Sequence, residues 1–318
     1  MLTYMRFVSI LALAALCATS CSVSEDSKNN RQNCTSSAFR AISRSDVKQN
    51  SEAMAMYAGK LPSPIFENCC ISGAPLTMNM GNPGDYLSMP VFMKVVEDGG
   101  NYYCFVVNHN PGGIVRLDFG NSLTNEPRAV DLGNPGKALN DYWGNESIEI
   151  VKANGNWYGI VVGGNPRSST TPRLVTIKFG PNLDNPRPEG INWGNVGNMW
   201  EPVDLHVFNE KGQWYGYTIN SESNTLTRFD FTDDFENPPT GVNLGNMGNF
   251  DYPTGMFVAN DKGEWRMFIV NRDGFSISRL DFGESLLSRP NFVDLGNPDD
   301  VLSLPRDLTI VNACGQYV

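Results

Sequence analysis

The chain has 318 residues and a net charge of −10 at pH 7, from 24 Lys and Arg against 34 Asp and Glu. A charge of this sign, without any cluster of basic residues, argues against a partner that is bound through a nucleic-acid phosphate backbone. Hydrophobic residues make up 41% of the chain, enough for a globular core, and the 31 glycines and 20 prolines are typical of a β protein with many turns.

Residues 1–20 predict a signal peptide. Arg6 precedes an apolar run over 7–17, which is too short to span a bilayer. The run is followed by Ala-Thr-Ser-Cys21, which resembles the lipobox of bacterial lipoproteins, and the acidic stretch 22–26 resembles the export tag of Bacteroidetes-type surface lipoproteins. These resemblances imply a lipid on Cys21 and a protein anchored in the outer membrane and exposed on the cell surface. A signal peptide cleaved near Cys21 without lipidation is the alternative.

Residues 21–60 are polar and rich in Ser, Asn, Gln and Lys. A stretch of this composition buries too little apolar surface to fold alone, so it predicts a flexible tether. The folded domain is therefore expected over 61–318.

A glycine-asparagine signature occurs five times in this domain, and its glycines stand 52, 61, 51 and 51 residues apart. A period near fifty that is built from strand-like runs and tight turns indicates a repeat architecture. The five copies are Met80–Gly84, Leu132–Gly136, Trp193–Gly197, Leu244–Gly248 and Leu295–Asp299.

Each repeat predicts four strands. An alternating strand such as that around Leu205 and Val207 is followed by a glycine turn, a strand that opens with an aromatic residue, and a third strand of the type Arg228-Phe-Asp-Phe231. A short fourth strand leads into the next signature. Four strands make one blade of a propeller, so the fold class is all-β.

The two ends of the chain predict how the ring closes. The chain stops at Val318, in the second strand of a fifth unit, whereas 64–67 and 75–80 match a third and a fourth strand. We therefore expect a five-bladed β-propeller in which N- and C-terminal strands share one blade, which removes exposed sheet edges. Cys314 would then lie in the same blade as Cys69 and Cys70, so a disulfide from Cys314 to one of them is expected. A truncated piece of a longer array is the alternative.

The repeats resemble the β-propeller repeats of the NHL and YVTN kind found in bacterial surface proteins. The resemblance extends over residues 64–318, although the unit of about fifty residues is longer than the usual NHL spacing. It implies a propeller and leaves the ligand open.

Loops that join an outer strand to the next inner strand carry aromatic residues beside carboxylates. A flat ring under a sugar face, flanked by hydrogen-bonding carboxylates, is typical of glycan recognition. Packing of these rings between blades is the alternative. The loop residues that predict ligand binding are Tyr86, Asp141, Tyr142, Trp143, Trp200, Glu201, Asp251 and Tyr252.

Two acidic residues open inner strands, where they would point toward the central channel. These are Asp204 and Asp307, and we include both in the predicted binding site. Converging carboxylates could bind a cation or act as acid and base. The equivalent positions hold Phe92, Ser147 and Gly255, so solvated groups that merely line the channel are the alternative.

No catalytic set is recognisable, and with two histidines and no paired CxxC spacing we expect no metal site and no cofactor. The preferred hypothesis is therefore a non-catalytic binding module for a glycan or an envelope protein. An enzyme, a glycoside hydrolase or lyase that uses Glu201, Asp204, Asp251 and Asp307, is the second hypothesis. A structural component of a surface secretion or motility assembly, with a large apolar patch, is the third.

Overall fold

The computed structural model describes residues 78–313 and 316–317. The predicted signal peptide, Cys21, the tether and the three cysteines of the predicted disulfide (Cys69, Cys70 and Cys314) lie outside the described residues. The chain divides into two compact units, and the larger comprises residues 80–310 of the described part. The other unit holds the short strands β17 (Asn312–Ala313) and β18 (Gln316–Tyr317), which pair with each other.

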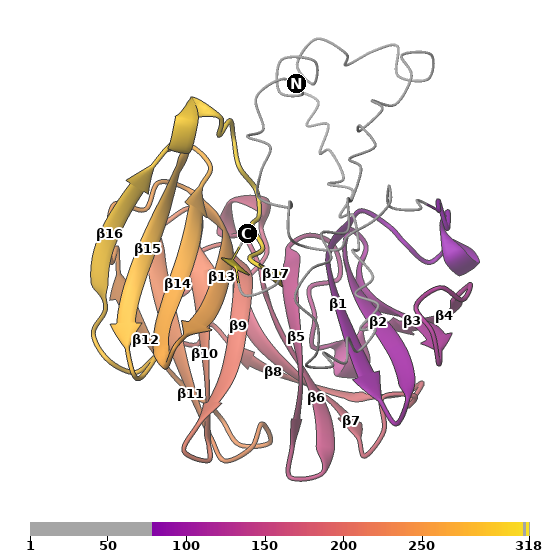
Figure 1. Ribbon diagram of the computed structural model, residues 1–318. Coiled ribbons are helices and arrows are strands. Elements are labelled where there is room, and N and C mark those ends of the chain that lie inside the picture. Colours follow the sequence, from indigo (N-terminus) through magenta and orange to yellow (C-terminus); the bar gives the residue numbers. More distant parts are fainter. Residues whose placement is uncertain (1–77, 314–315, 318) are drawn as a thin grey trace, which may run out of the picture. The chain divides into compact units, whose positions relative to one another are not determined.

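The larger unit contains four antiparallel sheets of four strands each, and in every sheet the strands lie side by side in chain order (Figure 1). The first sheet has β1 (Pro90–Asp98), β2 (Asn101–His109), β3 (Gly112–Gly120) and β4 (Arg128–Gly133). The second has β5 (Asn145–Ala153), β6 (Asn156–Gly163), β7 (Arg173–Gly180) and β8 (Glu189–Gly194). The third has β9 (Pro202–Glu210), β10 (Gln213–Asn220), β11 (Thr225–Thr232) and β12 (Thr240–Gly245). The fourth has β13 (Pro253–Asp261), β14 (Glu264–Asn271), β15 (Ser276–Gly283) and β16 (Asn291–Gly296).

Short 3₁₀ turns follow the outer strands or lie between strands. They are η1 (Pro83–Asp85), η2 (Pro135–Lys137), η3 (Pro166–Ser168) and η4 (Pro298–Asp300). Within the described part of the chain, no helix reaches the length and apolarity that crossing a bilayer requires.

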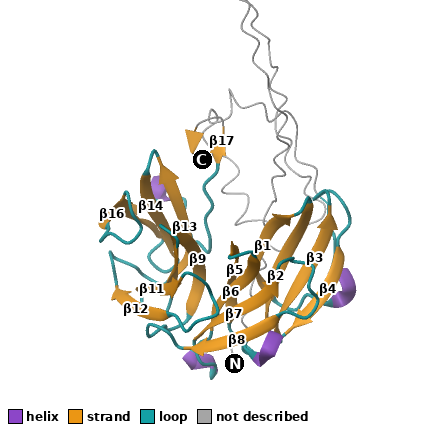
Figure 2. Cartoon of the chain, turned by 90° about the horizontal axis from the view of Figure 1, so that it is seen from below, coloured by secondary structure: helices purple, strands orange, loops and turns teal. Residues whose placement is uncertain are grey.

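The sheets are arranged as the blades of a β-propeller. The first strand of each sheet lies toward the centre and the fourth at the periphery (Figure 2), and β1, β5, β9 and β13 pack against one another in that order. Three hydrophobic cores lie between successive sheets, because both faces of an inner blade are apolar. Phe105 and Phe179 meet in the first of these cores, with ring centroids 4.9 Å apart. The predicted all-β propeller with four-stranded blades is therefore confirmed.

The glycine-asparagine signature fixes the loops between blades. The asparagine side chain donates to one backbone carbonyl and accepts from the N–H of that same residue, four or five positions later, in all five copies. In the second copy these bonds join Asn134 to Leu139 at 3.1 and 2.8 Å. Gly136 has a φ of +60°, and a Cβ on it would lie 2.3 Å from the carbonyl oxygen of Gly190 in the next blade. The signature thus holds each loop against the following blade.

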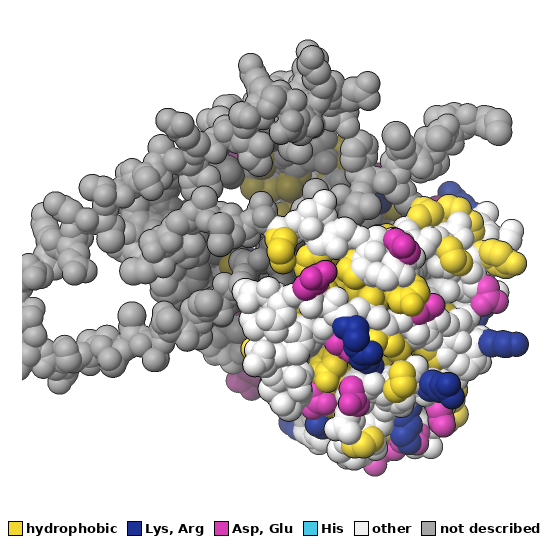
Figure 3. Space-filling view, turned by 90° about the vertical axis from the view of Figure 1, so that its right-hand side faces the viewer, with side chains coloured by type: hydrophobic (Ala, Val, Ile, Leu, Met, Phe, Trp, Pro, Cys, Tyr) yellow, Lys and Arg dark blue, Asp and Glu magenta, His cyan; other side chains and the backbone are white. Residues whose placement is uncertain are grey.

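The outer side of the first sheet is shown in Figure 3, where hydrophobic side chains are interspersed with acidic and basic ones. Arg128, on β4, pairs there with Asp118 at 2.7 Å. The exposed apolar residues on the first sheet include Val91 and Met93 on β1.

Candidate active site

The first strand of each four-stranded sheet carries a β-bulge. The bulge stands one residue before the position at which Asp204 and its equivalents in the other repeats were aligned. Bulges at the rim of a sheet re-aim the side chains beside them. The bulged residues are Val91, Glu146, Val203 and Thr254. The residues directly after them pair with equivalent positions on the second strands, as the repeat alignment predicted; they are Phe92, Ser147, Asp204 and Gly255.

Asp204 is buried between two inner strands, with 6% of its surface exposed. Its Oδ1 accepts hydrogen bonds from the N–H of Leu205 at 2.8 Å and from Ser147 Oγ at 3.4 Å, and its Oδ2 accepts from the N–H of Met256 at 2.7 Å. Burial above all, together with the negative charge of Asp307, raises the pKa of Asp204 to about 8 against the opposing effect of the N–H donors of Met256 and Leu205. Asp204 therefore keeps its proton at neutral pH.

Asp307 lies beside this acid and remains exposed to solvent. It packs on Gly255, since a Cβ added there would lie 2.6 Å from Asp307 Cα and 2.9 Å from its Oδ1. Partial burial raises the pKa of Asp307 as well, opposed by the N–H of Leu308. The structure therefore brings Asp204 and Asp307 together as two coupled carboxyl groups, one buried and one accessible.

Glu201 and Tyr252 form a second cluster on the loops that precede β9 and β13. Glu201 is 6% exposed, and it accepts hydrogen bonds from Asn165 Nδ2 at 2.8 Å and from the Tyr252 hydroxyl at 3.1 Å. Burial raises the pKa of Glu201, and the negative charges of Glu222 and Glu146 raise it further. Glu201 is therefore held by side chains from two other loops and lies close to two further acids.

A repeated backbone conformation positions Glu201 and Tyr252. Both adopt a positive φ, +54° and +51°, and their carbonyls accept from the N–H of Ser221 and of Arg272, each at 3.0 Å. Left-handed backbone is unfavourable for residues with a Cβ, so the surrounding loop must hold it. The same position in the other repeats also has a positive φ; these residues are Met89, Gly144 and Leu304.

Glu146 and Glu222, the two acids whose charges act on Glu201, each have a partner of their own. His109 Nδ1 lies 3.1 Å from Glu146 Oε1, and the Trp143 ring stands edge-on to the His109 ring with 5.0 Å between centroids. Arg167 Nη2 pairs with Glu222 Oε2 at 2.8 Å. His109 and Glu146 come from β2 and β5, so this contact joins the first two blades.

An ion pair lies two residues further along the inner strands. Lys94 Nζ on β1 is 2.8 Å from Glu149 Oε2 on β5, and Glu149 is buried. Burial raises the pKa of Glu149 more than Lys94 lowers it. His206 on β9 is half-buried nearby, and burial together with the charge of Lys94 lowers its pKa to about 4, so this imidazole is neutral.

Asp141 and Tyr142 belong to a separate cavity of about 240 Å³, here called the second-sheet pocket, lined by Lys137, Leu139–Tyr142, Ser169–Thr171 and Arg173. Asp141 Oδ1 accepts from Asn134 Nδ2 at 2.6 Å, and Tyr142 is 72% exposed.

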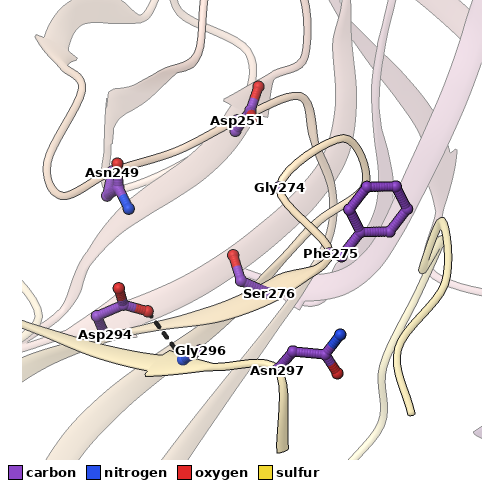
Figure 4. Close-up of a pocket in the computed structure, with 8 residues that line it drawn as sticks. All are labelled: Asn249, Asp251, Gly274, Phe275, Ser276, Asp294, Gly296 and Asn297. Carbon is purple, nitrogen blue, oxygen red and sulfur yellow. Dashed lines mark hydrogen bonds between the residues drawn. The ribbon is translucent and has the colours of Figure 1, made fainter. Parts of the chain in front are cut away.

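Asp251 lines another cavity, of about 420 Å³, here called the fourth-sheet pocket and shown in Figure 4. Its walls are Asn249, Asp251, Gly274–Ser276, Asp294, Gly296 and Asn297. Phe275 lies at one side of this pocket and is 42% exposed.

Tyr86 and Trp200 occupy different loops again. Tyr86 is exposed, and its ring lies where a side chain on Gly84 would stand. Trp200 is 45% exposed, and its backbone N–H donates a hydrogen bond to Asn220 Oδ1 at 3.2 Å. The predicted loop aromatics therefore lie at several separate places, and binding by them stays a prediction.

Several groups of the site were not predicted from the sequence. Glu146 stands one residue before Ser147, in the bulge of β5. A bulge cannot be recognised from the alternation of apolar and polar residues in the sequence. Lys94 and Glu149 stand two residues after aligned positions, on the same strand face, so the period of two could have found them. Among the described residues, no group of three or more His, Cys, Asp or Glu side chains is placed to hold a metal ion.

Comparisons with known proteins gave a structural likeness alone. No protein-family model and no curated protein match the chain, so the resemblance to NHL and YVTN repeats stays a prediction. The solved structures that resemble it include a thermostable family-43 glycoside hydrolase, with 14% identity over 69% of this chain and 74% of the other, at a TM-score of 0.45. The GH43_1 enzyme from Xanthomonas citri has 11% identity over 72% and 80%, at 0.44. The α-L-arabinofuranosidase from Podospora anserina has 14% identity over 68% and 70%, at 0.47.

These neighbours correct the preferred hypothesis of the sequence analysis. We expected a non-catalytic binding module, whereas the solved structures that resemble the chain are glycoside hydrolases by their titles. The reason for the error is physical: the acids come from separate strands and loops, so no contiguous catalytic motif marks them in the sequence.

Proposed function

We propose that the protein hydrolyses glycosidic bonds at the propeller face where Asp204 and Asp307 meet. The observation that carries this proposal is the carboxyl pair itself, one member protonated at neutral pH and the other open to solvent. Glycoside hydrolysis needs one carboxylic acid that gives a proton and one carboxylate that assists water or attacks the sugar.

In the proposed reaction, the leaving glycosidic oxygen takes a proton from Asp307 while its bond to the anomeric carbon breaks. Asp204 has a structural part in this proposal: both of its oxygens accept hydrogen bonds from backbone N–H groups, and the one from Met256 holds strand β13, on which Asp307 packs at Gly255. The oxygen of a water molecule becomes bonded to the anomeric carbon, and its proton passes to a second carboxylate.

Glu201 is the carboxylate that we assign to this second role. It stands on the loop that leads into the strand of Asp204, and its hydrogen bonds from Asn165 and Tyr252 fix its orientation. A carboxylate that accepts two such bonds is held in its charged form more firmly than burial alone would allow. Glu146, which is paired with His109, lies close enough to Glu201 for its charge to act on it.

The test is a panel of soluble polysaccharides, arabinoxylan, arabinan and galactan, incubated with the purified chain at pH 6 and analysed for released sugars. We expect release from at least one of them with a turnover in the usual range of about 1–10³ per second. No release from any member, by a chain shown to be folded, would overturn the proposal.

We also propose that a fifth blade completes the propeller, with N- and C-terminal strands in one sheet. The repeat continues past β16: Asn297 bridges to Leu302, and Leu304 has the positive φ of its counterparts. Asp307 then takes the aligned position beside Gly255, and Thr254 Oγ1 donates to the carbonyl of Pro305 at 3.0 Å. This start of a fifth inner strand supports a fifth blade.

Deletion of 311–318 should therefore lower the midpoint of thermal unfolding, by about 10 °C or more, because it leaves sheet edges and apolar faces uncovered. Deletion of 22–60, the predicted tether, is the control and should leave the midpoint unchanged. Equal midpoints for the two deletions would argue against a shared blade. Lipid attachment at Cys21 and exposure on the cell surface stay predictions from the sequence.

A further inference from the structure

Glu201 and Tyr252 occupy the same position in neighbouring repeats, and the propeller brings their side chains into contact. The Tyr252 hydroxyl donates to Glu201 Oε2 at 3.1 Å. The other repeats have Met89, Gly144 and Leu304 at this position, so the backbone conformation that all five share requires neither a carboxyl group nor a hydroxyl group. A glutamate is rarely buried to this extent unless it has a partner and a purpose. The pair is therefore a special feature of these two repeats.

Glu201 has no basic partner, although it lies beside two acids that have one. Glu222 pairs with Arg167 at 2.8 Å, and Glu146 lies 3.1 Å from His109. Within the part of the chain that the structure describes, no Lys, Arg or His forms an ion pair with Glu201. Burial raises the pKa of Glu201, and the charges of Glu222 and Glu146 raise it further. To act as a base, Glu201 therefore depends on neutral donors that favour its ionised form.

Tyr252 is the more important of the two donors to Glu201. After burial, the hydrogen bond from Tyr252 has the largest effect on the pKa of Glu201, which it lowers, and the bond from Asn165 lowers it less. Burial above all, together with the charge of Glu201, raises the pKa of Tyr252 to about 12 against the opposing charge of Arg272. The hydroxyl therefore keeps its proton and remains a donor.

Tyr252 is itself fixed at its backbone and at its ring. Its N–H donates to Asn224 Oδ1 at 2.7 Å, and its carbonyl accepts from the N–H of Arg272 at 3.0 Å. The Arg272 guanidinium lies over the ring, 4.0 Å from the centroid, and its Nε donates to Asp273 Oδ1 at 2.6 Å. A cation over an aromatic face is attracted to it. The hydroxyl is therefore held at Glu201 by contacts on both sides of the ring's attachment to the chain.

We propose that Tyr252 is a positioning residue for the proposed hydrolysis and that Arg272 holds it in place, so that the Glu201 carboxylate stays ionised and in one orientation. This inference rests on the role that the proposed function gives to Glu201, and it adds two residues that act through Glu201 without touching the sugar. Loss of the Tyr252 hydroxyl should therefore change the charge of Glu201 and leave the binding of the substrate unchanged.

The test is a titration of the Glu201 carboxyl group by ¹³C NMR in the full chain, with its resonance identified by its loss in Glu201→Gln. Tyr252→Phe keeps the ring beneath Arg272 and removes the hydroxyl, so the titration midpoint of Glu201 should rise by about one pH unit. Arg272→Leu should raise the midpoint by about half a unit, as expected for a cation over a ring at a partly exposed site. Arg272→Lys should restore most of that shift.

Tyr158→Phe is the matched control, because the Tyr158 hydroxyl also donates to a glutamate, Glu236 Oε1, at 2.7 Å. It should leave the midpoint of Glu201 at the value of the parent chain. The inference is overturned if Tyr252→Phe moves this midpoint no further than Tyr158→Phe does, or if Arg272→Leu leaves it unchanged.

The rate of sugar release at different pH values provides the second readout. In Tyr252→Phe, kcat should fall about tenfold at pH values below the midpoint of Glu201 and little at pH values well above it, with KM unchanged. An equal fall at every pH would indicate a structural role and overturn the inference. A raised midpoint in a chain whose parent releases no sugar would support the hold on Glu201 and overturn the proposed reaction. Hydrolysis by the parent with an unchanged pH profile in Tyr252→Phe would overturn this inference alone.

Discussion

Asp307→Asn should lower the rate of polysaccharide hydrolysis by about 10²–10⁴-fold, the usual contribution of a general acid. The amide cannot donate the proton that the leaving oxygen needs, while its size leaves the contact with Gly255 in place. Because Asp307 is exposed, the midpoint of thermal unfolding should change little. The measurement is the initial rate of sugar release at saturating substrate, alongside a thermal melt.

Asp300→Asn is the matched control, since Asp300 is an exposed acid of the same segment, at the end of η4. Its rate should equal that of the parent chain. A rate for Asp307→Asn within twofold of the control would contradict the role given to Asp307, whatever substrate is used.

The stability of the fold should fall as the pH rises from about 5 to 8, by about 1.4 kcal/mol per pH unit from Asp204. The sign follows from the raised pKa: the folded state keeps a proton on Asp204 up to about pH 8, whereas the unfolded chain loses it near pH 4. The stabilisation is therefore fully present below pH 4 and lost as the pH passes through 8. Burial raises the pKa of Asp307, Glu149 and Glu201 in the same sense.

Denaturant unfolding at pH 5, 6, 7 and 8 measures this slope. Asp204→Asn removes the titrating group, so its free energy of unfolding should depend on pH less steeply than that of the parent, by about the same 1.4 kcal/mol per unit. The comparison concerns slopes, so a general loss of stability in the variant leaves it usable. Parallel slopes for the two chains would show that Asp204 titrates normally.

The repeat period made the fold and part of the site predictable. Strands with a period of two, placed at a fixed offset from a glycine signature, assign the same position to Asp204 and Asp307 in different repeats, and in the structure Asp307 packs on Gly255, close enough to Asp204 for its charge to raise the Asp204 pKa. The signature also marks loops that are fixed in the same way each time, so a local pattern was enough to locate them.

The rest of the site depends on contacts that no local pattern records. Glu146 reaches the rim through a bulge, and Glu201 gains its partners from two other loops. The aromatic residues were read as one ring of ligand contacts because each follows a signature, yet the loops place them apart, and Tyr142 is the one among them that lines either of the two pockets described.

Hydrolysis in ¹⁸O-labelled water tests the central claim most directly. The purified chain is incubated with the polysaccharide of the panel that it cleaves fastest, and the masses of the released sugars are measured by mass spectrometry. We predict one ¹⁸O atom at the anomeric carbon of each new reducing end, and an appearance of this labelled product that is about 10²–10⁴-fold slower with Asp307→Asn. Products without the label, or an intact polysaccharide, would contradict a hydrolase at this face of the propeller.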